Sequence, residues 1–372
     1  MKKYFFLFII FPLAGIFLPG CVQPNGSSPD KTVEKPLSDI RYAQGFAVFR
    51  KNGKTKVVVY NPWKKGKSIL KTFILVHRHP QAGEIKVPLE QVAVFSSTQL
   101  NGLQMLGLLH RVTGISEARF LSNPLIKKRL AEGKTREMAA GGHYFIETIL
   151  QQKPAAIFYS PFQGNTELPA TLSSIPAIPY LDYTETDPLG RAEWIKFSAL
   201  FFGKEKAADS IFGRIETKYL SLKKLTDSLR QRPSVFSGKF FNGQWFVPGG
   251  KSYMAQIFRD AGADYLWKND PHVASIPLNF ETVFQRAKAA DYWRMTGSLG
   301  TLPSYAEIGS ENKLYTHFKA FREHHIIYCN TRQTAYFERG AMAPQRILAD
   351  FIKAFHPELL PRYQPVFYHL LK

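Results

Sequence analysis

The run Val92-Ala93-Val94-Phe95-Ser96-Ser97-Thr98-Gln99 decides the fold class of this chain. Its four apolar residues predict a short strand that is buried on both faces. The three hydroxyl residues that follow are typical of a helix start, and helical spacing of apolar residues continues over 99–109. A strand, a polar turn and a helix in this order form the first half of a βαβ unit, which indicates an α/β fold.

The same alternation extends on both sides of this run. Lys51-Asn52-Gly53 separates two short apolar runs, which predicts a β-hairpin. Strands are predicted at 45–49, 56–60, 72–76, 155–159 and 177–181, and a further helix at 145–152, before Pro154. Strands that alternate with helices predict a mainly parallel sheet with helices on both faces.

The chain changes character at about residue 188 and returns to strand–helix alternation at about residue 233. Helical spacing prevails over 188–232, and Gly203 marks a break. The second half predicts strands at 234–241, 290–295 and 325–329 and helices at 253–261, 280–287 and 344–355. We therefore expect two Rossmann-like lobes, 39–187 and 233–372, with mainly parallel central sheets, joined by a long helical connector, 188–232. The alternative is that this stretch forms two ordinary helices of one lobe.

The first residues predict export and lipidation. Lys2 and Lys3 precede an apolar run over 4–17, which is the length of a secretory signal and short for a membrane-spanning helix. Leu18-Pro19-Gly20-Cys21 resembles a lipobox, although Pro19 departs from the usual pattern. We expect a signal peptide over 1–20 and a lipidated tether over 21–38, anchored through Cys21. Plain cleavage and an uncleaved anchor are the alternatives.

The formal charge of +20 argues for anionic partners. Nucleic acid is excluded as a partner because an exported protein meets no genome and no basic arm or groove-filling helix is evident. An anionic membrane surface and an anionic ligand both suit a cationic lipoprotein. The aromatic share of 14% is high enough to fill two cores and to line a site for a flat ligand.

Motifs for catalysis and metal binding are weak. Gly249-Gly250-Lys251-Ser252 fails as a P-loop because Trp245 stands where the first glycine belongs. The histidines flanking Arg78 and the pair at 324–325 lack a third ligand signal, so no metal site is predicted.

Three acids, Asp182, Glu185 and Asp187, follow a predicted strand. A solvated loop between the lobes is the favoured interpretation over an acid–base pair. No nucleophile motif appears, so we predict no catalytic residue and no enzyme activity. Cys329, in the apolar run 326–329, is predicted to be a packed free thiol.

Four segments carry a family resemblance, and their order makes the case. They are 145–158, 278–291, 246–253 with 261–263, and 336–340 before 344–348. Together they resemble the solute-binding lipoproteins of ABC importers for metal chelates, the ferric-siderophore and cobalamin family, whose two lobes are joined by a helical backbone. The likeness spans about 70–355 and departs from the family at Ala289, where a proline is usual.

This resemblance implies capture of a ligand between the lobes and delivery to a permease. By motif position, Glu147 and Glu281 would dock the protein onto permease arginines. The ligand would lie at the carboxyl ends of the strands, and it would be the transported cargo, with no resident cofactor. The candidate ligand-binding residues are Arg78, Ser96, Ser97, Tyr159, Phe162, Phe241, Trp245, Lys251, Trp293, Arg294, Tyr336 and Arg339.

The implied partners are an ABC permease dimer of the inner membrane with its ATPase, the chelate, and the bilayer through Cys21, with the protein in the periplasm. A ferric siderophore is the first expectation for the ligand, and cobalamin or haem comes next. Two other functions stay open at this stage: a membrane-tethered α/β hydrolase or transferase, and a zinc-binding component.

Overall fold

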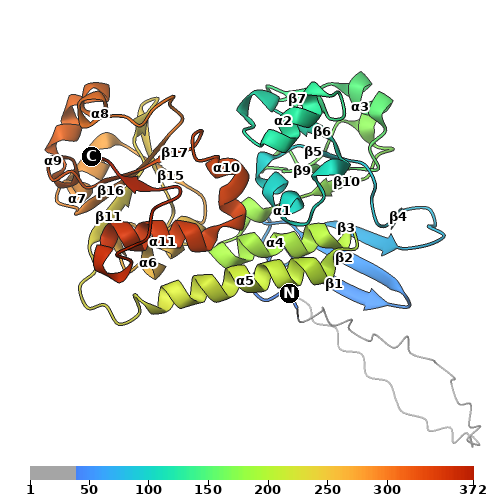
Figure 1. Cartoon of the computed structure of the whole chain (residues 1–372), viewed down its shortest axis with the longest axis horizontal. Coiled ribbons are helices and arrows are strands. Elements are labelled where there is room, and N and C mark those ends of the chain that lie inside the picture. The colour runs from blue at the N-terminus through green and yellow to red at the C-terminus, as the bar shows by residue number, and fades with distance from the viewer. Residues whose placement is uncertain (1–38) are drawn as a thin grey trace, which may run out of the picture. The chain divides into compact units, whose positions relative to one another are not determined.

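A computed structural model describes residues 39–372, which contain two α/β halves and a separate N-terminal sheet (Figure 1). The predicted signal peptide 1–20, Cys21 and the tether up to residue 38 lie outside the described residues. The described part belongs to one compact unit of the chain. One hydrophobic cluster runs through both halves, and a small second cluster lies in the first half.

The first half is built on a six-stranded sheet in the order β10-β9-β5-β6-β7-β8. All its pairings are parallel except that of β8 with β7. Every residue of β5 and β9 is buried, as a central parallel strand requires. The strands are β5 (Val92–Val94), β6 (Val112–Ser116), β7 (Arg136–Ala140), β8 (His143–Tyr144), β9 (Ala156–Tyr159) and β10 (Ala177–Pro179); the helices are α1 (Leu100–Met105), α2 (Pro124–Ala131) and α3 (Ile146–Gln152).

The second half has a five-stranded sheet in the order β14-β11-β16-β17-β18 and a small antiparallel sheet β12-β13-β15. In the larger sheet only β18 runs antiparallel. The strands are β11 (Ser234–Ser237), β12 (Phe240–Phe241), β13 (Gln244–Val247), β14 (Asp264–Tyr265), β15 (Ile276–Leu278), β16 (Tyr292–Gly297), β17 (Ile326–Asn330) and β18 (His369–Leu370). The helices are α6 (Tyr253–Asp260), α7 (Phe280–Ala287), α8 (Tyr305–Glu311), α9 (Lys319–Arg322), α10 (Tyr336–Arg339) and α11 (Pro344–Phe355).

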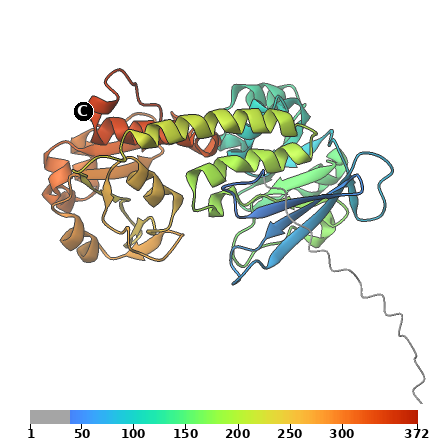
Figure 2. The same ribbon diagram turned by 90° about the horizontal axis from the view of Figure 1, so that it is seen from below.

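Two helices, α4 (Pro188–Leu200) and α5 (Glu205–Lys224), lie between the sheets in sequence. Gly203, at φ +62°, separates them, as the sequence predicts. Helix α5 packs on α4 and also on α11 of the second half (Figure 2), so it contacts both halves. The α/β fold with two mainly parallel sheets and a helical link between them is thereby confirmed.

The N-terminal sheet is an addition with its own order, β1-β2-β3-β4. Its strands are β1 (Phe46–Lys51), β2 (Lys54–Tyr60), β3 (Ile69–Val76) and β4 (Glu84–Lys86). The predicted hairpin is β1–β2. The strand predicted at 72–76 is β3, which pairs with β2 and β4 and does not join the parallel sheet of the first half. An apolar strand does not specify its partner, so the sequence pattern left this pairing open.

The inner face of this sheet packs on α4. The ring of Phe46 contacts those of Trp194 and Phe197 at centroid distances of 5.0 and 5.2 Å, and Phe73 contacts Phe201 at 5.8 Å. Edge-to-face pairs of this kind contribute beyond the apolar area that they bury. The sheet is therefore part of the core of the first half.

Two buried carboxylates fasten residues 41–45 to α4. Glu193 accepts backbone N–H groups of Arg41, Tyr42 and Ala43 at 2.7–3.1 Å, and its side chain is wholly buried. Glu185 accepts the N–H groups of Gln44 and Gly45 and the indole N–H of Trp194.

The expectation of a solvated loop is wrong for Glu185 and also for Asp182, since both side chains are buried. Burial raises the pKa of both carboxyls, and their hydrogen-bond donors oppose that rise. A loop of acidic residues looks solvated in sequence because its buried donors come from distant parts of the chain.

Other boundaries differ from prediction for local reasons. The strand predicted at 234–241 is broken at Gly238, which has φ +95°, and the helix predicted at 99–109 ends at Met105, just before Gly107. The apolar patterns of the sequence predicted no strand at the positions of β6, β7 and β18. Cys329, on β17, is a buried free thiol as predicted, and burial raises its pKa to about 11.

Replacing Glu193 by alanine tests how much the attachment of residues 41–43 stabilises the fold. It would leave three backbone N–H groups and Lys196, whose Nζ lies 3.2 Å from the carboxylate, without this acceptor. We expect the free energy of unfolding to fall by about 3 kcal/mol. Urea denaturation of a soluble form starting at Val22 measures this fall. The control Glu205→Ala removes only a 3.6 Å surface pair with Arg50 and should cost less than about 1 kcal/mol. An unchanged midpoint for Glu193→Ala would contradict the role given to this carboxylate.

Candidate functional site

A cavity of about 210 Å³ lies where elements of the two halves meet. Tyr183 of the first half and Arg191 of α4 form one wall. The other wall comes from the second half and consists of Tyr253, Tyr336 and Phe337. Tyr253 is the first residue of α6, which begins at Ser252, whose side chain accepts the N–H of Ala255. Tyr336 and Phe337 begin α10. The site is therefore assembled from residues more than 150 positions apart in the chain.

A buried ion pair supports the first wall. The Nε of Arg191 donates to Oδ2 of Asp182 at 3.0 Å, and the exposed fractions of the two side chains are 14% and 1%. The Arg191 guanidinium also lies over the ring of Tyr253 at 4.9 Å from the centroid, a cation–π contact between the halves. Oδ1 of Asp182 is buried without a hydrogen-bond partner.

A row of tyrosines leads from Arg191 to a second buried arginine. The hydroxyls of Tyr253 and Tyr336 are 3.4 Å apart, and the rings of Tyr336 and Tyr368 lie 5.6 Å apart. The hydroxyl of Tyr368 accepts a hydrogen bond from Arg294, which also donates to Oγ of Ser237 at 3.2 Å. The Nε of Arg294 is buried with no partner.

The cluster has an excess of positive charge. It contains two arginines and one carboxylate, that of Asp182. Burial disfavours the charged guanidinium of Arg191, but Asp182 and the neighbouring tyrosines outweigh this effect and raise its pKa. Burial also disfavours the charged form of Tyr253, which by itself would raise the pKa of this phenol. The Arg191 and Arg294 cations outweigh this effect, so the pKa of Tyr253 lies below its ordinary value. A wall of this kind favours an anionic group in the cavity.

A second connection between the halves lies beside this cavity. Glu338 of α10 is buried, and its carboxylate accepts the N–H and the hydroxyl of Ser122 and, at 3.0 Å, the N–H of Asn123. Asn123 caps α2 by accepting the N–H groups of Leu125 and Ile126. The carboxylate therefore latches α10 of the second half to the start of α2 in the first.

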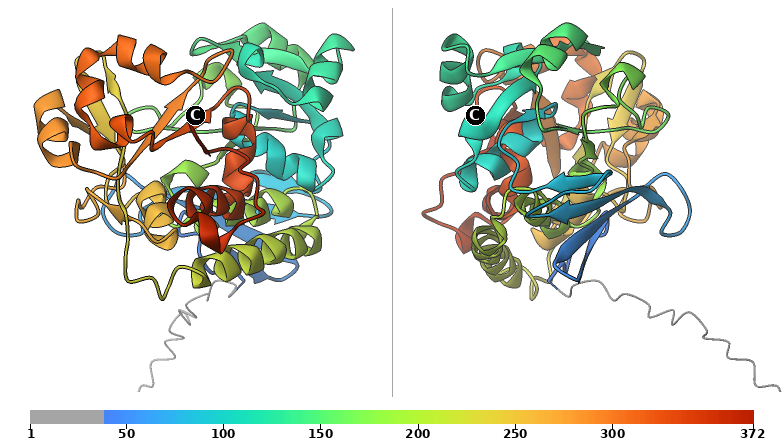
Figure 3. Two further views of the ribbon diagram at one scale, coloured as in Figure 1. Left: turned by 60° about the vertical axis from the view of Figure 1, so that its left-hand side comes forward. Right: turned by 90° about the vertical axis from the view of Figure 1, so that its right-hand side faces the viewer.

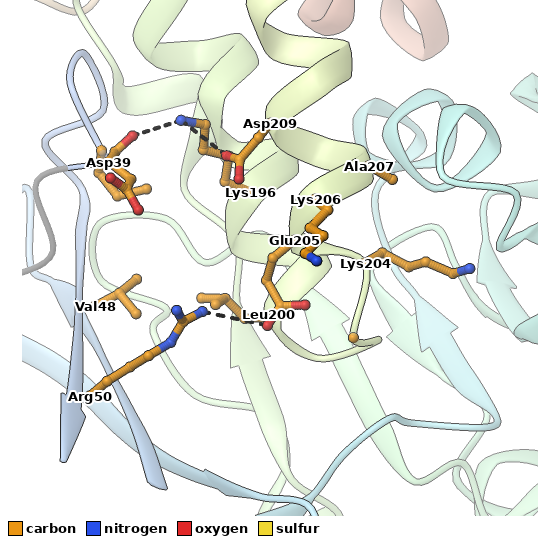
Figure 4. Close-up of a pocket in the computed structure, with 12 residues that line it drawn as sticks. Asp39, Val48, Arg50, Lys196, Leu200, Lys204, Glu205, Lys206, Ala207 and Asp209 are labelled. Atoms are coloured by element: carbon orange, nitrogen blue, oxygen red, sulfur yellow. Dashed lines mark hydrogen bonds and ion pairs between the residues drawn. The ribbon is translucent and has the colours of Figure 1, made fainter. Parts of the chain in front are cut away.

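A larger cavity, of about 550 Å³, lies elsewhere, between β1, α4 and the start of α5 (Figure 4). Here cations face acids: Lys196 contacts Asp209 at 3.4 Å, and Arg50 contacts Glu205 at 3.6 Å. This cavity has no aromatic wall, and the N-terminal sheet supplies part of its lining. We assign the ligand site to the smaller cavity because only there do aromatic rings from both halves surround an excess of cationic charge.

Only Tyr336 among the predicted ligand-binding residues lines the assigned cavity, and Arg294 lies behind it. Arg339 is exposed beside the latch, with its guanidinium 5.6 Å from the Phe367 centroid. The remaining polar or exposed candidates lie on other elements: Ser96 and Ser97 after β5, Tyr159 bonded to the Thr166 carbonyl, Phe162 and Phe241 exposed, Lys251 exposed before α6, and Arg78 exposed on the loop between β3 and β4.

Trp245 and Trp293 are placed in the core of the second half, where neither side chain is accessible. Their indole N–H groups donate to the carbonyls of Ser237 and Gly238 at 3.0 and 2.7 Å. Neither ring has surface to offer a ligand in this structure, because aromatic neighbours cover both.

Gly249 and Gly250 also serve packing. An added Cβ would lie 2.2 and 2.5 Å from backbone carbonyl oxygens of His272 and Trp267. The glycines permit this close approach, which accounts for the motif without a phosphate.

Sequence reasoning missed Arg191, Tyr253, Tyr183 and Phe337. Arg191 is one of two cations in the mostly buried helix α4, and no local pattern in the sequence distinguishes it from Lys196. Glu147 and Glu281, the predicted docking residues, are exposed in the first turns of α3 and α7.

Within residues 39–372, no group of three or more His, Cys, Asp or Glu side chains is arranged to hold a metal ion. No helix in that range is long and apolar enough to cross a membrane.

These features define a class: a binding protein with two α/β halves and a site between them. A family model described as "Periplasmic binding protein" matches residues 92–332. The chain belongs to this family.

Individual relatives agree in fold. An uncharacterized lipoprotein of Methanocaldococcus jannaschii is 30% identical over 286 residues, which cover 74% of this chain and 67% of that protein. A structure from an ABC-type Fe3+-hydroxamate transport system of Saccharomonospora viridis has a TM-score of 0.56 at 14% identity and covers 72% of this chain and 94% of that one. The periplasmic haem-binding protein HutB of Vibrio cholerae gives a TM-score of 0.56 at 15% identity, covering 70% and 98%.

A double-mutant cycle between Glu338 and Ser122 tests the latch. Glu338→Gln replaces one acceptor oxygen by a donor that faces backbone N–H groups, and Ser122→Ala removes the hydroxyl donor. We expect a coupling energy of about 1 kcal/mol in the free energy of unfolding, measured by urea denaturation. The control pair Glu338→Gln with Ser221→Ala, an exposed hydroxyl on α5, should be additive. Additive energies for the first pair would contradict the latch.

Proposed function

We propose that this protein is the substrate-binding lipoprotein of an ABC importer and that it captures a metal chelate between its two halves. Family membership supports the solute-binding role. The buried cluster of Arg191, Tyr253 and Tyr336 supports an anionic, flat ligand, because guanidinium groups bind carboxylate or catecholate oxygens and tyrosine rings cover flat surfaces. This cationic and aromatic wall is the observation on which the proposal rests.

A ferric siderophore is the ligand that we favour, with haem or cobalamin next. Of the solved structures with the same fold, one comes from an ABC-type Fe3+-hydroxamate transport system and another is a periplasmic haem-binding protein. The cavity of about 210 Å³ is smaller than a typical site for a drug-sized ligand, about 300–1,000 Å³. In this proposal the cavity holds the anionic end of the chelate, and the exposed rings of Tyr183 and Phe337 cover the rest.

Delivery follows from the same proposal. Cys21 carries the lipid that anchors the protein to a membrane in the periplasm. Glu147 and Glu281 dock onto cations of the permease dimer, whose ATPase drives transport. Capture and release make and break no covalent bond, so the protein acts as a carrier and not as a catalyst.

Ligand titration of the Val22 form tests the site. We expect one of hydroxamate and catecholate ferric siderophores, haemin and cobalamin to bind with micromolar or tighter affinity in isothermal titration calorimetry. Arg191→Gln should weaken that binding at least tenfold, because it removes a charged contact to the anion. Since this change also leaves Asp182 unpaired, Tyr253→Phe serves as a second variant that keeps the ion pair. Arg50→Gln, in the larger cavity, should bind as the unmodified protein does. No binding by any chelate, or equal loss with Arg50→Gln, would refute the assigned site.

Permease docking has a separate test. Glu147→Ala with Glu281→Ala should leave chelate affinity unchanged, because neither residue lines the cavity. Ligand-dependent stimulation of ATP hydrolysis by the reconstituted importer should fall at least tenfold, since paired charges at an interface set orientation and association rate. Glu90→Ala with Glu358→Ala, two other exposed acids, is the control. Full stimulation by the first double variant would remove these glutamates from the docking surface.

A further inference from the structure

The N-terminal sheet concentrates the positive charge of the chain. Residues 46–86 contain ten lysines and arginines and one acid, Glu84, a formal net charge of +9. The whole chain carries +20, so almost half of the excess lies in these 41 residues. The family match begins at residue 92, which places this basic sheet outside the part that binding proteins of the family share.

The architecture of the sheet directs these cations outward. Its inner face is apolar and packs on α4 through Phe46 and Phe73. Successive side chains of a strand point to alternate faces of the sheet, and residues paired across two strands share a face. Lys51 pairs with Lys54 across β1 and β2, and Val76 pairs with Lys86 across β3 and β4. Exposed lysines therefore occupy the outer face and the loops at both ends: Lys51, Lys54, Lys64, Lys65, Lys67 and Lys86.

Apolar groups lie among these cations. Ile69 is 59% exposed at the start of β3, and Trp63 is half-buried in the loop that joins β2 to β3. That loop, residues 61–68, also carries Lys64, Lys65 and Lys67. A cationic surface with an exposed aliphatic side chain and a half-buried indole, which also packs against the core, suits the boundary between lipid headgroups and acyl chains.

The position of this surface in the chain indicates its partner. Residues 39–45 lead directly from the predicted lipid anchor at Cys21 into β1. The loop 61–68 borders residues 40–47, since both line one cavity of about 420 Å³. Only 17 residues, 22–38, separate Cys21 from the described chain, a reach of about 60 Å at most. The basic surface thus stays within reach of the bilayer, and Figure 3 shows the sheet that carries it.

We propose that the outer face of β1–β4 with the loop 61–68 is a docking surface for anionic lipid headgroups of the bilayer. The anchor at Cys21 would limit the distance to the membrane, and this surface would set the orientation. The proposal is independent of the identity of the chelate, because no residue of the sheet lines the assigned ligand cavity.

Vesicle sedimentation of the Val22 form, which lacks Cys21 and its lipid, tests the proposal. Within the described residues 39–372, the hydrophobic core extends over 43–371, and the Val22 form contains all of it. We expect binding to vesicles of mixed phosphatidylglycerol and phosphatidylcholine, loss of that binding at high salt, and no binding to pure phosphatidylcholine. Equal binding to both kinds of vesicle would overturn the electrostatic surface, and no binding to either would overturn the proposal.

A matched pair of variants locates the surface. The first variant changes four lysines of this surface to glutamine: Lys51, Lys64, Lys65 and Lys86. It should weaken binding to phosphatidylglycerol vesicles at least tenfold, since each cation near the membrane raises the affinity about fivefold. The control changes Lys218, Lys224, Lys288 and Lys313 to Gln, removing the same charge from exposed positions outside the sheet. Equal loss in both variants would mean that net charge alone drives binding and would overturn the site. An unchanged urea midpoint of unfolding in both variants shows an intact fold without any ligand, which separates failure of this proposal from failure of the proposed function.

Discussion

Burial of helix α4 is the constraint on which the other parts of this protein depend. Eleven of its 13 residues are buried, and the side chains of the other two, Arg191 and Lys196, are only 14% and 11% exposed. Its aromatic face supports the N-terminal sheet through Trp194 and Phe197, and Arg191 supports the ligand cavity. A helix enclosed in this way cannot shift without disturbing both the sheet and the cavity, because protein interiors are close-packed.

Charges inside the structure are tolerated because Glu193 and Glu185 each have several donors and Asp182 has a cationic partner. Glu193 and Glu185 accept backbone N–H groups of residues 41–45, and Asp182 pairs with Arg191. Gly190 lets the chain lie close, since an added Cβ would be 2.9 Å from the carbonyl oxygen of Tyr42. Burying a carboxylate without partners would cost several kcal/mol, so the entering segment and α4 specify each other.

Three of the connections between the two halves have different properties. Helix α5 packs on α4 and α11, the Glu338 carboxylate latches α10 to the start of α2, and Arg191 lies over the ring of Tyr253. The first connection is broad and apolar, whereas the other two are polar contacts beside the cavity.

The sequence by itself determined the alternation of strands and helices, the break at Gly203, the buried thiol of Cys329 and the family. These depend on local patterns: runs of apolar residues, their spacing, and residues that end helices. Of the cavity wall it predicted Tyr336, and Arg294 behind it, but it missed Arg191 and Tyr253.

Only the tertiary structure decided that β3 joins the N-terminal sheet, that Trp245 and Trp293 are core residues, and that the acids at 182 and 185 are buried. The physical reason is common to these cases. Strand pairing, burial of a ring and the partners of a carboxylate depend on residues tens to hundreds of positions away, and local pattern carries no information about which of them arrive.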